Sequence, residues 1–256
     1  MDLHYFQDWV LKEFGINLKA YKQNQLQRRI LSLMSRVGVN SVEEYIKLLK
    51  KEPHQRKKFL DFITINVSEF FRNPEIFDDL EKKLENELFK EGKRSVKIWS
   101  AACSIGAEPY SLAIILDELA HGMNHKIIAT DIDSTIIERA KKGEYTNSEI
   151  KNIKNSRLQK YFKKMDDKYY IEQKIKNMVT FKKHDLILDN YDKGFDLIVC
   201  RNVVIYFNQD VKEDIYKKFR DSLKPNGLLF VGATESIYNY KDYGFEKVST
   251  FIYRKL

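Results

Sequence analysis

Cysteine is scarce in this sequence, because Cys103 and Cys200 are the only two among its 256 residues. Two cysteines give no disulfide framework and fit a reducing compartment, so we expect a cytoplasmic protein. The sequence also lacks an apolar run long enough to span a membrane, and its first residues lack the basic-then-apolar order of a signal peptide. Its five histidines form no pattern with the cysteines that is typical of metal ligands, so we expect no metal.

Positive charge exceeds negative charge, with 45 Lys and Arg residues against 37 Asp and Glu residues and a net charge of +8. Such an excess indicates an acidic partner, which is nucleic acid, an anionic membrane surface or an acidic protein, unless it only reflects a lysine-rich host. Apolar residues make up 43% of the chain, enough for the core of one large domain, or of a large domain with a small companion. No long apolar heptad suggests an obligate coiled coil, and we expect a monomer.

The first part of the chain has the pattern of helices. Apolar residues recur at helical spacing, and Pro53 and Pro74 stand where helices are expected to begin. This pattern predicts an all-helical N-terminal domain over residues 1–75.

From Val96 onward, apolar runs alternate with amphipathic segments. Helices are expected at about 109–120, 134–142 and 209–222. This alternation predicts a Rossmann-like α/β domain over residues 76–256, with a parallel sheet and an antiparallel edge formed by the last residues. The polar, lysine-rich stretch 145–178 interrupts the alternation and is either a small inserted subdomain or a flexible loop.

The expected strand ends carry residues that suit a nucleoside with a positive charge, because open parallel sheets bind ligands beyond the carboxyl ends of their strands. The loop WSAACSIGAEPYS is rich in small residues and leads to Glu108, which either complements a helix dipole or contacts the positive end of the ligand. Asp131 suits ribose hydroxyls, whereas Asp133 is placed to cap the next helix. Asp185 suits an adenine amino group. Arg201 and Asn202 end the fourth expected strand.

Four segments carry a family pattern: INVSEFFRNP at 65–74, IWSAACSIGAEPYSLA at 98–113, ATDIDSTIIERAKKGEY at 129–145 and FDLIVCRNVVIYF at 195–207. Together they resemble the CheR family, the chemotaxis receptor glutamate methyltransferases, over nearly the whole chain. The FFR and RNVVIYF segments are specific to this family, whereas the other loops are shared by many methyltransferases. The resemblance implies a class I methyltransferase fold, S-adenosylmethionine as cofactor and S-adenosylhomocysteine as product. It also implies that glutamate γ-methyl esters form on chemotaxis receptors, which adapts chemotactic signalling, and that the helical domain recognises the substrate.

The resemblance also assigns residues, which lie within these segments except for Asp185 and Leu186 after the expected strand MVTFKKHD. Those implied in cofactor binding are Asn66, Ser68, Arg72, Glu108, Asp131, Asp185, Leu186, Arg201 and Asn202. The sequence departs from the family where Ser68 replaces threonine, where Ala107 replaces a second glutamate and where Asp185 replaces a frequent asparagine. The last departure leaves the contact of Asp185 open.

Arg72 and Tyr206 match the family positions nearest the transferred methyl group, which makes them the candidate catalytic residues. A glutamate side chain is ionised at neutral pH, so its oxygen attacks the methyl group without a general base. Catalysis then depends on positioning, with Arg72 orienting the carboxylate and Tyr206 donating a hydrogen bond. The alternatives are a structural ion pair for Arg72 and an ordinary core aromatic for Tyr206.

No acidic residue occurs between Glu13 and Glu43, whereas Lys22, Arg29 and Arg36 recur every seven residues. On a helix these three form one basic stripe, which suits the acidic cytoplasmic helices of receptors, suits phosphate, or is simply solvated surface. Family members that bind a receptor tail peptide use a glycine-containing turn in the inserted subdomain. No glycine occurs here between Gly143 and Gly194, so we expect no tethering by a tail peptide.

Two other functions are compatible with parts of the pattern. The basic helix is compatible with a nucleic-acid methyltransferase, but base-amine methylases of this fold usually carry an Asn/Asp-Pro-Pro-aromatic run where this chain has Arg201-Asn202-Val203-Val204. A regulator that binds the cofactor without catalysis is opposed by the presence of Arg72 and Tyr206. We therefore expect a receptor methyltransferase without a nucleic-acid partner or membrane insertion.

Overall fold

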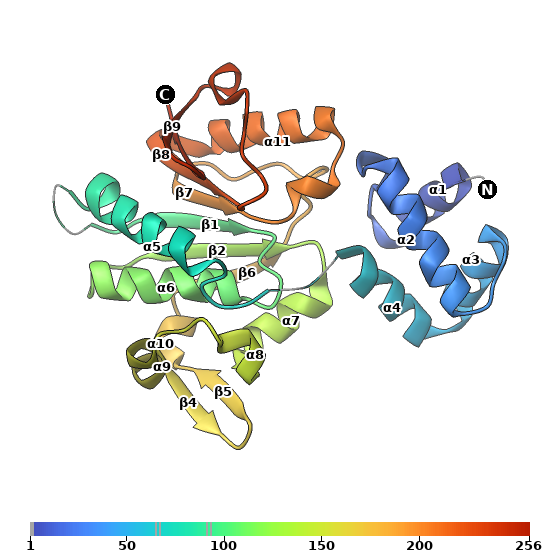
Figure 1. Ribbon diagram of the computed structural model, residues 1–256, viewed down its shortest axis with the longest axis horizontal. Coiled ribbons are helices and arrows are strands. Elements are labelled where there is room, and N and C mark those ends of the chain that lie inside the picture. The colour runs from blue at the N-terminus through green and yellow to red at the C-terminus, as the bar shows by residue number, and fades with distance from the viewer. Residues whose placement is uncertain (1–2, 65, 67, 91, 93) are drawn as a thin grey trace. The chain divides into compact units, whose positions relative to one another are not determined.

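The computed structural model of the protein describes residues 3–64, 66, 68–90, 92 and 94–256. These residues form two compact units (Figure 1). The first unit contains the described residues up to Asn66 together with Tyr206–Glu213, and the second contains the other described residues. The units divide near residue 66, whereas the predicted domain division lies at 75.

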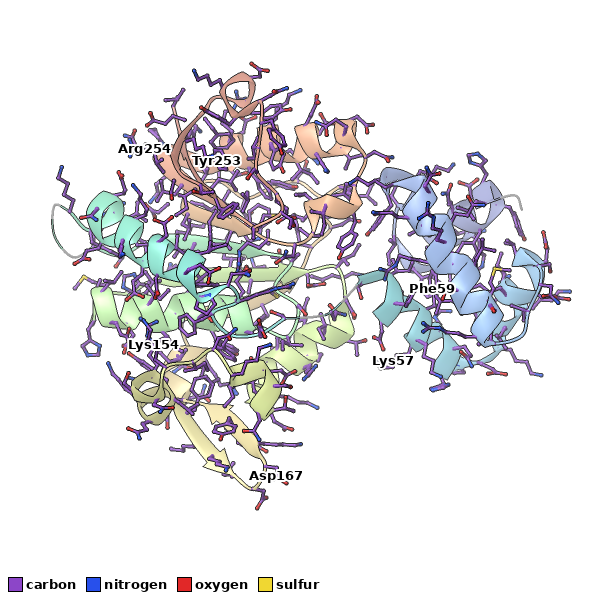
Figure 2. All side chains as sticks on the ribbon, viewed as in Figure 1. Lys57, Phe59, Lys154, Asp167, Tyr253 and Arg254 are labelled. Atoms are coloured by element: carbon purple, nitrogen blue, oxygen red, sulfur yellow. The ribbon has the colours of Figure 1, made fainter. Side chains whose placement is uncertain are left out.

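The first unit is helical, as its apolar spacing predicted. Its helices are α1 (Leu3–Phe14), η1 (Leu18–Ala20), α2 (Gln23–Arg36), α3 (Val42–Lys51) and α4 (Pro53–Thr64). Apolar residues three or four positions apart face one core, in which the rings of Phe6 and Phe59 meet edge to face at 5.6 Å. On α4, Phe59 lies in this core and Lys57 lies on the surface (Figure 2).

Within the described residues of the second unit, a seven-stranded sheet has the order β6-β2-β1-β7-β8-β10-β9. The strands are β1 (Lys97–Ala101), β2 (Lys126–Asp131), β6 (Val179–Lys183), β7 (Phe195–Cys200), β8 (Leu223–Val231), β9 (Phe245–Ser249) and β10 (Ile252–Lys255). The strands from β6 to β8 run parallel, and β10 is antiparallel to both β8 and β9. Every residue of β7 is buried, as expected for a strand with helices on both faces. The predicted Rossmann-like sheet with an antiparallel edge is confirmed.

Helices cover both faces of this sheet (Figure 1). They are α5 (Pro74–Lys83), which continues into the π-helical turn η2 (Leu84–Leu88), α6 (Ala107–Leu119), α7 (Ser134–Lys142) and α11 (Gln209–Ser222). The helices α6 and α7 lie on one face, and α11 lies on the other, where Phe219 meets Trp99 edge to face at 5.4 Å. Both α7 and α11 have the predicted bounds, whereas the helix predicted from residue 109 begins at Ala107. Among the described residues, no helix combines the length and apolar character that crossing a bilayer requires.

The stretch predicted as an insertion forms its own small structure. Its elements are β3 (Glu144–Tyr145), α8 (Asn147–Ile150), α9 (Asn155–Tyr161), β4 (Phe162–Met165), β5 (Lys168–Ile171) and α10 (Gln173–Lys176). The strands form an antiparallel sheet in the order β3-β5-β4, and Asp167 lies at the tip of the β4–β5 hairpin (Figure 2). The turn places Asp166 at a φ of +52°, so an aspartate occupies a left-handed position that often holds glycine. We call residues 144–176 the inserted subdomain.

The turn from β1 into α6 depends on Gly106. Its φ is +83°, and a Cβ atom there would lie 3.0 Å from the Cβ of Ala140 and 3.2 Å from ring atoms of Phe181 and Tyr110. Glycine therefore satisfies both the left-handed backbone and the close approach of α7.

We predict that Gly106→Ala destabilises the protein more than Gly122→Ala. Gly122 has nearly the same φ, +84°, but a Cβ atom there would have no neighbour within 4 Å. Gly122→Ala serves as the control and should lose about 1 kcal/mol of unfolding free energy from backbone strain alone. Gly106→Ala should lose about 1–3 kcal/mol more through overpacking. Urea unfolding followed by circular dichroism measures both, and equal losses would contradict the packing role.

Candidate active site

The loops after β1, β2, β6 and β7 meet at one edge of the sheet, because the carboxyl ends of parallel strands lie together. The strand β1 lies between β2 and β7, so the direction of the crossovers reverses there, which is where open α/β sheets bind ligands. Backbone hydrogen bonds join the loops. The Cys103 amide donates to the Thr130 carbonyl at 2.8 Å, and the His184 amide donates to the Asp131 carbonyl at 2.9 Å. The predicted residues of these loops are thus brought together.

Glu108 lies in the first turn of α6 with its side chain 12% exposed. The Ser100 hydroxyl donates to its Oε1 at 2.8 Å, and Arg201 Nη1 lies 3.8 Å from its Oε2. Burial raises the pKa of Glu108 to about 6, although the charges of Arg201 and Arg72 oppose this rise. A positively charged ligand group near Glu108 would favour the ionised carboxylate.

Asp131 ends β2, and both of its carboxylate oxygens accept backbone hydrogen bonds. Its Oδ2 accepts from the Ser104 amide at 2.8 Å, and its Oδ1 accepts from the Asp133 amide at 3.1 Å. Burial raises the pKa of Asp131 to about 6, against the lowering effect of these amides. Asp131 therefore ties the loop after β1 to the end of β2, and its role in ribose binding stays a prediction.

Asp133 and Asp185 both accept hydrogen bonds from the backbone that follows them. The predicted cap is confirmed, because Asp133 Oδ1 accepts from the amides of Thr135 at 2.8 Å and Ile136 at 3.3 Å at the start of α7. Asp185 follows β6, and its Oδ1 accepts from the Ile187 amide at 2.7 Å. The neighbouring Leu186 is 7% exposed. Binding of the adenine end by Asp185 and Leu186 stays a prediction.

Arg201 follows β7 with its side chain only 2% exposed. Its Nη2 donates to Arg72 O at 2.8 Å and to Asn73 Oδ1 at 3.2 Å. Its guanidinium lies 5.0 Å from the ring centres of both Phe77 and Phe230. Arg201 thus joins the end of β7 to the segment 68–73 that precedes α5. This segment carries Arg72. Burial raises the pKa of Glu108 and lowers that of Arg201, and the attraction between Glu108 and Arg201 opposes both shifts. The charge of Arg72 has a smaller effect and lowers both pKa values.

Glu235 is a further residue of the site, absent from the predicted residues, and it is 4% exposed. Its carboxylate accepts from the backbone amides of Asn202 at 2.5 Å, Gly232 at 2.9 Å and Val203 at 3.0 Å. Burial raises the pKa of this carboxyl, against the lowering effect of the amides. Glu235 therefore fixes the backbone of Asn202, which has a φ of +61°. The available signal was an acidic residue shortly after the apolar run LLFVGA, as in ATDID.

Left-handed backbone gathers in the same region. Seven described non-glycine residues have positive φ, and five of them lie in these loops or in segment 68–73: Phe71, Asn73, Ala102, Ser104 and Asn202. Such conformations are unfavourable for these residues and persist where the surrounding structure holds them, frequently at functional sites. The two thiols of the chain, Cys103 and Cys200, are free and buried there as well, and burial raises their pKa values.

Buried polar atoms without a hydrogen-bond partner lie in these loops too. Among the described residues they are Ser104 Oγ, His184 Nε2, Asp185 Oδ2 and Arg201 Nε. Buried polar side chains normally have partners, so this set of donors and acceptors fits a polar ligand. A nucleoside offers matching amino, ring-nitrogen and hydroxyl groups. The residues present therefore fit the expected cofactor. The described part of the chain contains no group of three or more His, Cys, Asp or Glu side chains that could hold a metal ion.

The remaining cofactor candidates are divided between the two units. Ser68 is half-buried and belongs to the second unit, as Arg72 does. Asn66 belongs to the first unit, where its side-chain amide donates to Thr64 Oγ1 at 2.9 Å. The roles of Asn66 and Ser68 stay predictions.

Tyr206 lies in the first unit, beside two of the predicted substrate-binding residues. Its carbonyl accepts from the Lys22 amide at 2.9 Å. A cavity of about 300 Å³ in this unit is lined by Tyr21, Lys22, Gln25, Leu26, Arg28, Arg29, Ile63 and Tyr206. Its wall carries three basic residues and no acidic one, so it is suited to an acidic group.

The basic stripe along α2 is organised around one aromatic ring. The guanidinium of Arg29 lies 4.2 Å from the ring centre of Phe62 and donates to the Phe62 carbonyl, and the guanidinium of Arg36 lies 5.7 Å from the same ring. Burial lowers the pKa of Arg29, against the raising effects of Tyr206 and Tyr21. Lys22 and Arg36 are exposed. The structure thus gathers Arg29 and Arg36 on one surface, and their contact with a substrate stays a prediction.

We predict that Glu108→Gln stabilises the protein without ligand at pH 7.5 and has little effect at pH 4. The folded pKa of about 6 exceeds the usual glutamate pKa of 4.5, so the protonated carboxyl favours folding below pH 4.5 and that contribution is lost as the pH rises through 6. Removing the charge should therefore add about 2 kcal/mol at the higher pH. Urea unfolding at both pH values measures the difference, with the exposed Glu138→Gln as control. The same change at both pH values would contradict the effect of burial on Glu108.

Comparison with known proteins identifies the family. The CheR methyltransferase SAM-binding domain matches residues 66–253, and the CheR methyltransferase all-alpha domain matches residues 1–64. The chain is 41% identical over 254 residues to a chemotaxis protein methyltransferase of Listeria innocua, covering 99% of this chain and 97% of that protein. It is 34% identical over 255 residues to a chemotaxis protein methyltransferase of Borreliella burgdorferi, covering 94% of this chain and 90% of that protein. It is 32% identical over 237 residues to a chemotaxis protein methyltransferase of Escherichia coli, covering 89% of this chain and 81% of that protein. The chain therefore belongs to the CheR family of S-adenosylmethionine-dependent methyltransferases.

Proposed function

We propose that this methyltransferase forms γ-methyl esters on glutamate side chains of chemotaxis receptors. The observation that carries the proposal is the cluster of Glu108, Arg201 and Arg72 at the carboxyl edge of the sheet, which combines a buried carboxylate with two guanidinium groups. The carboxylate suits the positive end of the cofactor, and a guanidinium suits the carboxylate of a substrate glutamate. The names of the relatives, chemotaxis protein methyltransferases, support receptors as the substrate.

S-adenosylmethionine supplies an electrophilic methyl group on a sulfonium, and S-adenosylhomocysteine is the product. The substrate carboxylate forms the new O–C bond while the C–S bond breaks, so no proton has to be removed. Glu108 would hold the ammonium group of the methionine end, Asp131 would accept hydrogen bonds from the ribose hydroxyls, and the loop residues Asp185 and Leu186 would hold adenine. Arg201 and Asn202 line the same site, and no metal takes part.

Arg72 orients the substrate carboxylate in this proposal. Its peptide carbonyl is held by Arg201, so the start of the side chain is fixed by the end of β7. The family pattern further assigns Tyr206 to the substrate carboxylate as a hydrogen-bond donor, and assigns Asn66 and Ser68 to the cofactor. Catalysis is then mostly orientation of the reactants.

We predict that the protein transfers labelled methyl groups from S-adenosylmethionine to receptor-rich membranes and that alkali releases them as methanol. Esters are base-labile, whereas methylated bases and amines keep the label. Arg72→Ala should lower turnover at saturating cofactor by about 100-fold, the scale expected when orientation is lost. Full turnover by this variant would refute the role of Arg72. Alkali-stable label in added RNA would instead support a nucleic-acid methyltransferase.

The basic stripe of α2 and the adjoining cavity are proposed to receive an acidic helix of the receptor. Lys22, Arg29 and Arg36 lie on or beside α2, and the acid-free wall of the cavity includes Lys22 and Arg29. Attraction between opposite charges speeds association and weakens with salt.

We predict that Arg29→Glu with Arg36→Glu raises the KM for receptor at least about tenfold by reversing this attraction. The affinity for S-adenosylhomocysteine, measured by calorimetry, should stay unchanged because neither Arg29 nor Arg36 is among the residues assigned to the cofactor. A matched control is Lys47→Glu with Lys50→Glu on α3, which alters charge by the same amount. Loss of both receptor methylation and cofactor affinity would indicate misfolding and contradict the assignment.

Tethering by a receptor tail peptide is not part of the proposed mechanism. The β4–β5 hairpin turns at Asp166 and Asp167 without glycine, which places two acidic residues where tethering relatives are expected to have a glycine turn. A tight complex with a receptor tail peptide in a calorimetric titration would contradict this view.

A further inference from the structure

The inserted subdomain contacts the segment that carries Arg72. The Glu69 carboxylate lies 2.7 Å from Lys151 Nζ, and the Phe70 amide donates to the Glu149 carbonyl at 2.9 Å. Both partners lie in or beside α8 of the subdomain. Residues 69 and 70 are therefore fixed by the subdomain through a side chain and through the backbone.

Aromatic packing continues this contact. The ring of Phe70 is fully buried and meets Tyr145 of β3 edge to face at 4.7 Å and Phe162 of β4 at 5.2 Å. Edge-to-face pairs at these distances are favourable and directional. The ring of Phe70 thus packs between β3 and β4 of the subdomain through these two aromatic contacts.

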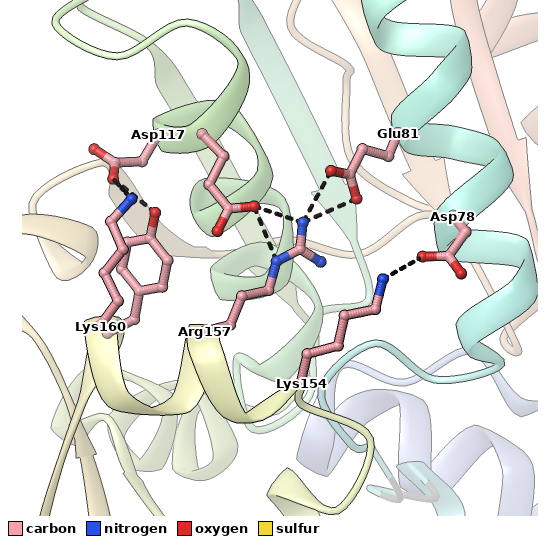
Figure 3. Close-up of polar contacts among 8 residues, drawn as sticks. Asp78, Glu81, Asp117, Lys154, Arg157 and Lys160 are labelled. Atoms are coloured by element: carbon pink, nitrogen blue, oxygen red, sulfur yellow. Dashed lines mark hydrogen bonds and ion pairs between the residues drawn. The ribbon is translucent and has the colours of Figure 1, made fainter.

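Arg157 is a buried polar link between the subdomain and the rest of the second unit. It lies on α9, and its side chain is 8% exposed. Its Nη2 lies 2.9 Å from both carboxylate oxygens of Glu81 on α5, and its Nε donates to Glu118 Oε2 on α6 at 2.9 Å. Figure 3 shows Arg157 directed from α9 toward Glu81 of α5. One guanidinium thereby joins three helices.

The neighbouring ion pair is much weaker. Lys154 Nζ lies 3.2 Å from Asp78 Oδ1, with side chains 63% and 48% exposed (Figure 3). Exposed pairs of this kind contribute little to stability. The planar, forked guanidinium of Arg157 binds two carboxylates at once, which a lysine does not reproduce.

The guanidinium of Arg157 also covers a residue next to Arg72. Its carbon lies 4.8 Å from the ring centre of Phe71. Phe71 has a φ of +48°, an unfavourable backbone conformation for phenylalanine, and its amide donates to Ser111 Oγ at 3.1 Å. Arg157 therefore holds the ring of a strained residue, while Arg201 holds the carbonyl of the next one.

We propose that Arg157 is a positioning residue: from the inserted subdomain it fixes Phe71 and so sets the place of Arg72 at the carboxyl edge of the sheet. This inference rests on the proposed function, in which Arg72 orients the substrate, and on the family pattern, which also assigns Arg72 to the cofactor. It gives the subdomain a role inside the enzyme that needs no receptor tail.

The test compares Arg157→Met with Tyr161→Phe, a variant of the same helix. Tyr161 OH donates to Asp117 Oδ2 of α6 at 2.9 Å, so the control also removes a polar link between α9 and α6. Because Arg157→Met leaves two acids without their partner, a second variant adds Glu81→Gln and Glu118→Gln to keep the fold. Arg157→Lys keeps the positive charge without the forked guanidinium and shows how much of the wild-type exchange rate and affinity the charge alone preserves.

Two readouts separate positioning from general stability. The first is hydrogen exchange of the Phe70 and Phe71 amides in the protein without ligand, which should be faster in the Arg157 variants and unchanged in Tyr161→Phe. The second is the affinity for S-adenosylhomocysteine by calorimetry, which should fall on the order of tenfold in the Arg157 variants and not in the control. The loss of affinity caused by the Arg157 variants should vanish when Arg72 is already alanine, because Arg157 acts on the cofactor only by positioning Arg72.

An undiminished loss in the Arg72→Ala background, or unchanged exchange at residues 70 and 71, would overturn the positioning role. A wild-type protein that binds S-adenosylhomocysteine but esterifies no receptor would overturn the proposed function alone. The exchange and affinity measurements would still decide the role of Arg157 in that case.

Discussion

Arg201 is a guanidinium that folding removes almost completely from water, and a buried cation needs acceptors on every side. Its Nη2 donates to the Arg72 carbonyl and the Asn73 side chain, and its Nη1 faces Glu108 at longer range, whereas its Nε has no partner among the described residues. These acceptors come from the segment before α5 and from the start of α6. The contacts of one charge therefore bring two separate parts of the chain to the end of β7, and the rest of the site lies around that junction.

The carboxylates of the site are held by backbone amides and a nearby cation, yet burial still raises their pKa values. Asp131 accepts from two amides, and Glu235 accepts from three. Glu108 and Asp131 both have pKa values of about 6. The folded protein thus keeps negative charge at a place where it is costly before a ligand arrives. A ligand with positive charge and hydroxyl groups relieves that cost, which favours binding of the methyl donor over binding of a neutral nucleoside.

Local patterns predicted much of this architecture. The bounds of α7 follow from the Asp133 cap and the apolar period, and the apolar run FDLIVC predicted the fully buried β7. The grouping of Glu108, Asp131 and Arg201 followed from their positions at strand ends. Arg157 escaped prediction because Glu118 and Glu81 lie more than thirty residues away and no period or motif marks it. Glu235 was missed, although it follows the apolar run LLFVGA, because its partners Asn202 and Val203 are also more than thirty residues away. Asp131 shows a subtler limit: a strand-end position does not reveal that both oxygens already bind the backbone.

Both thiols of the chain lie sealed in the core, with Cys103 and Cys200 each 1% exposed and their pKa values raised by burial. Neither offers an accessible thiolate, so reagents such as maleimides should leave the native protein unmodified. Cysteines introduced on the surface would then be the only reactive thiols. One cysteine on α4 and one on α9 would carry a donor and an acceptor dye, and energy transfer would report the distance between these two helices during turnover. Neither native cysteine would have to be replaced.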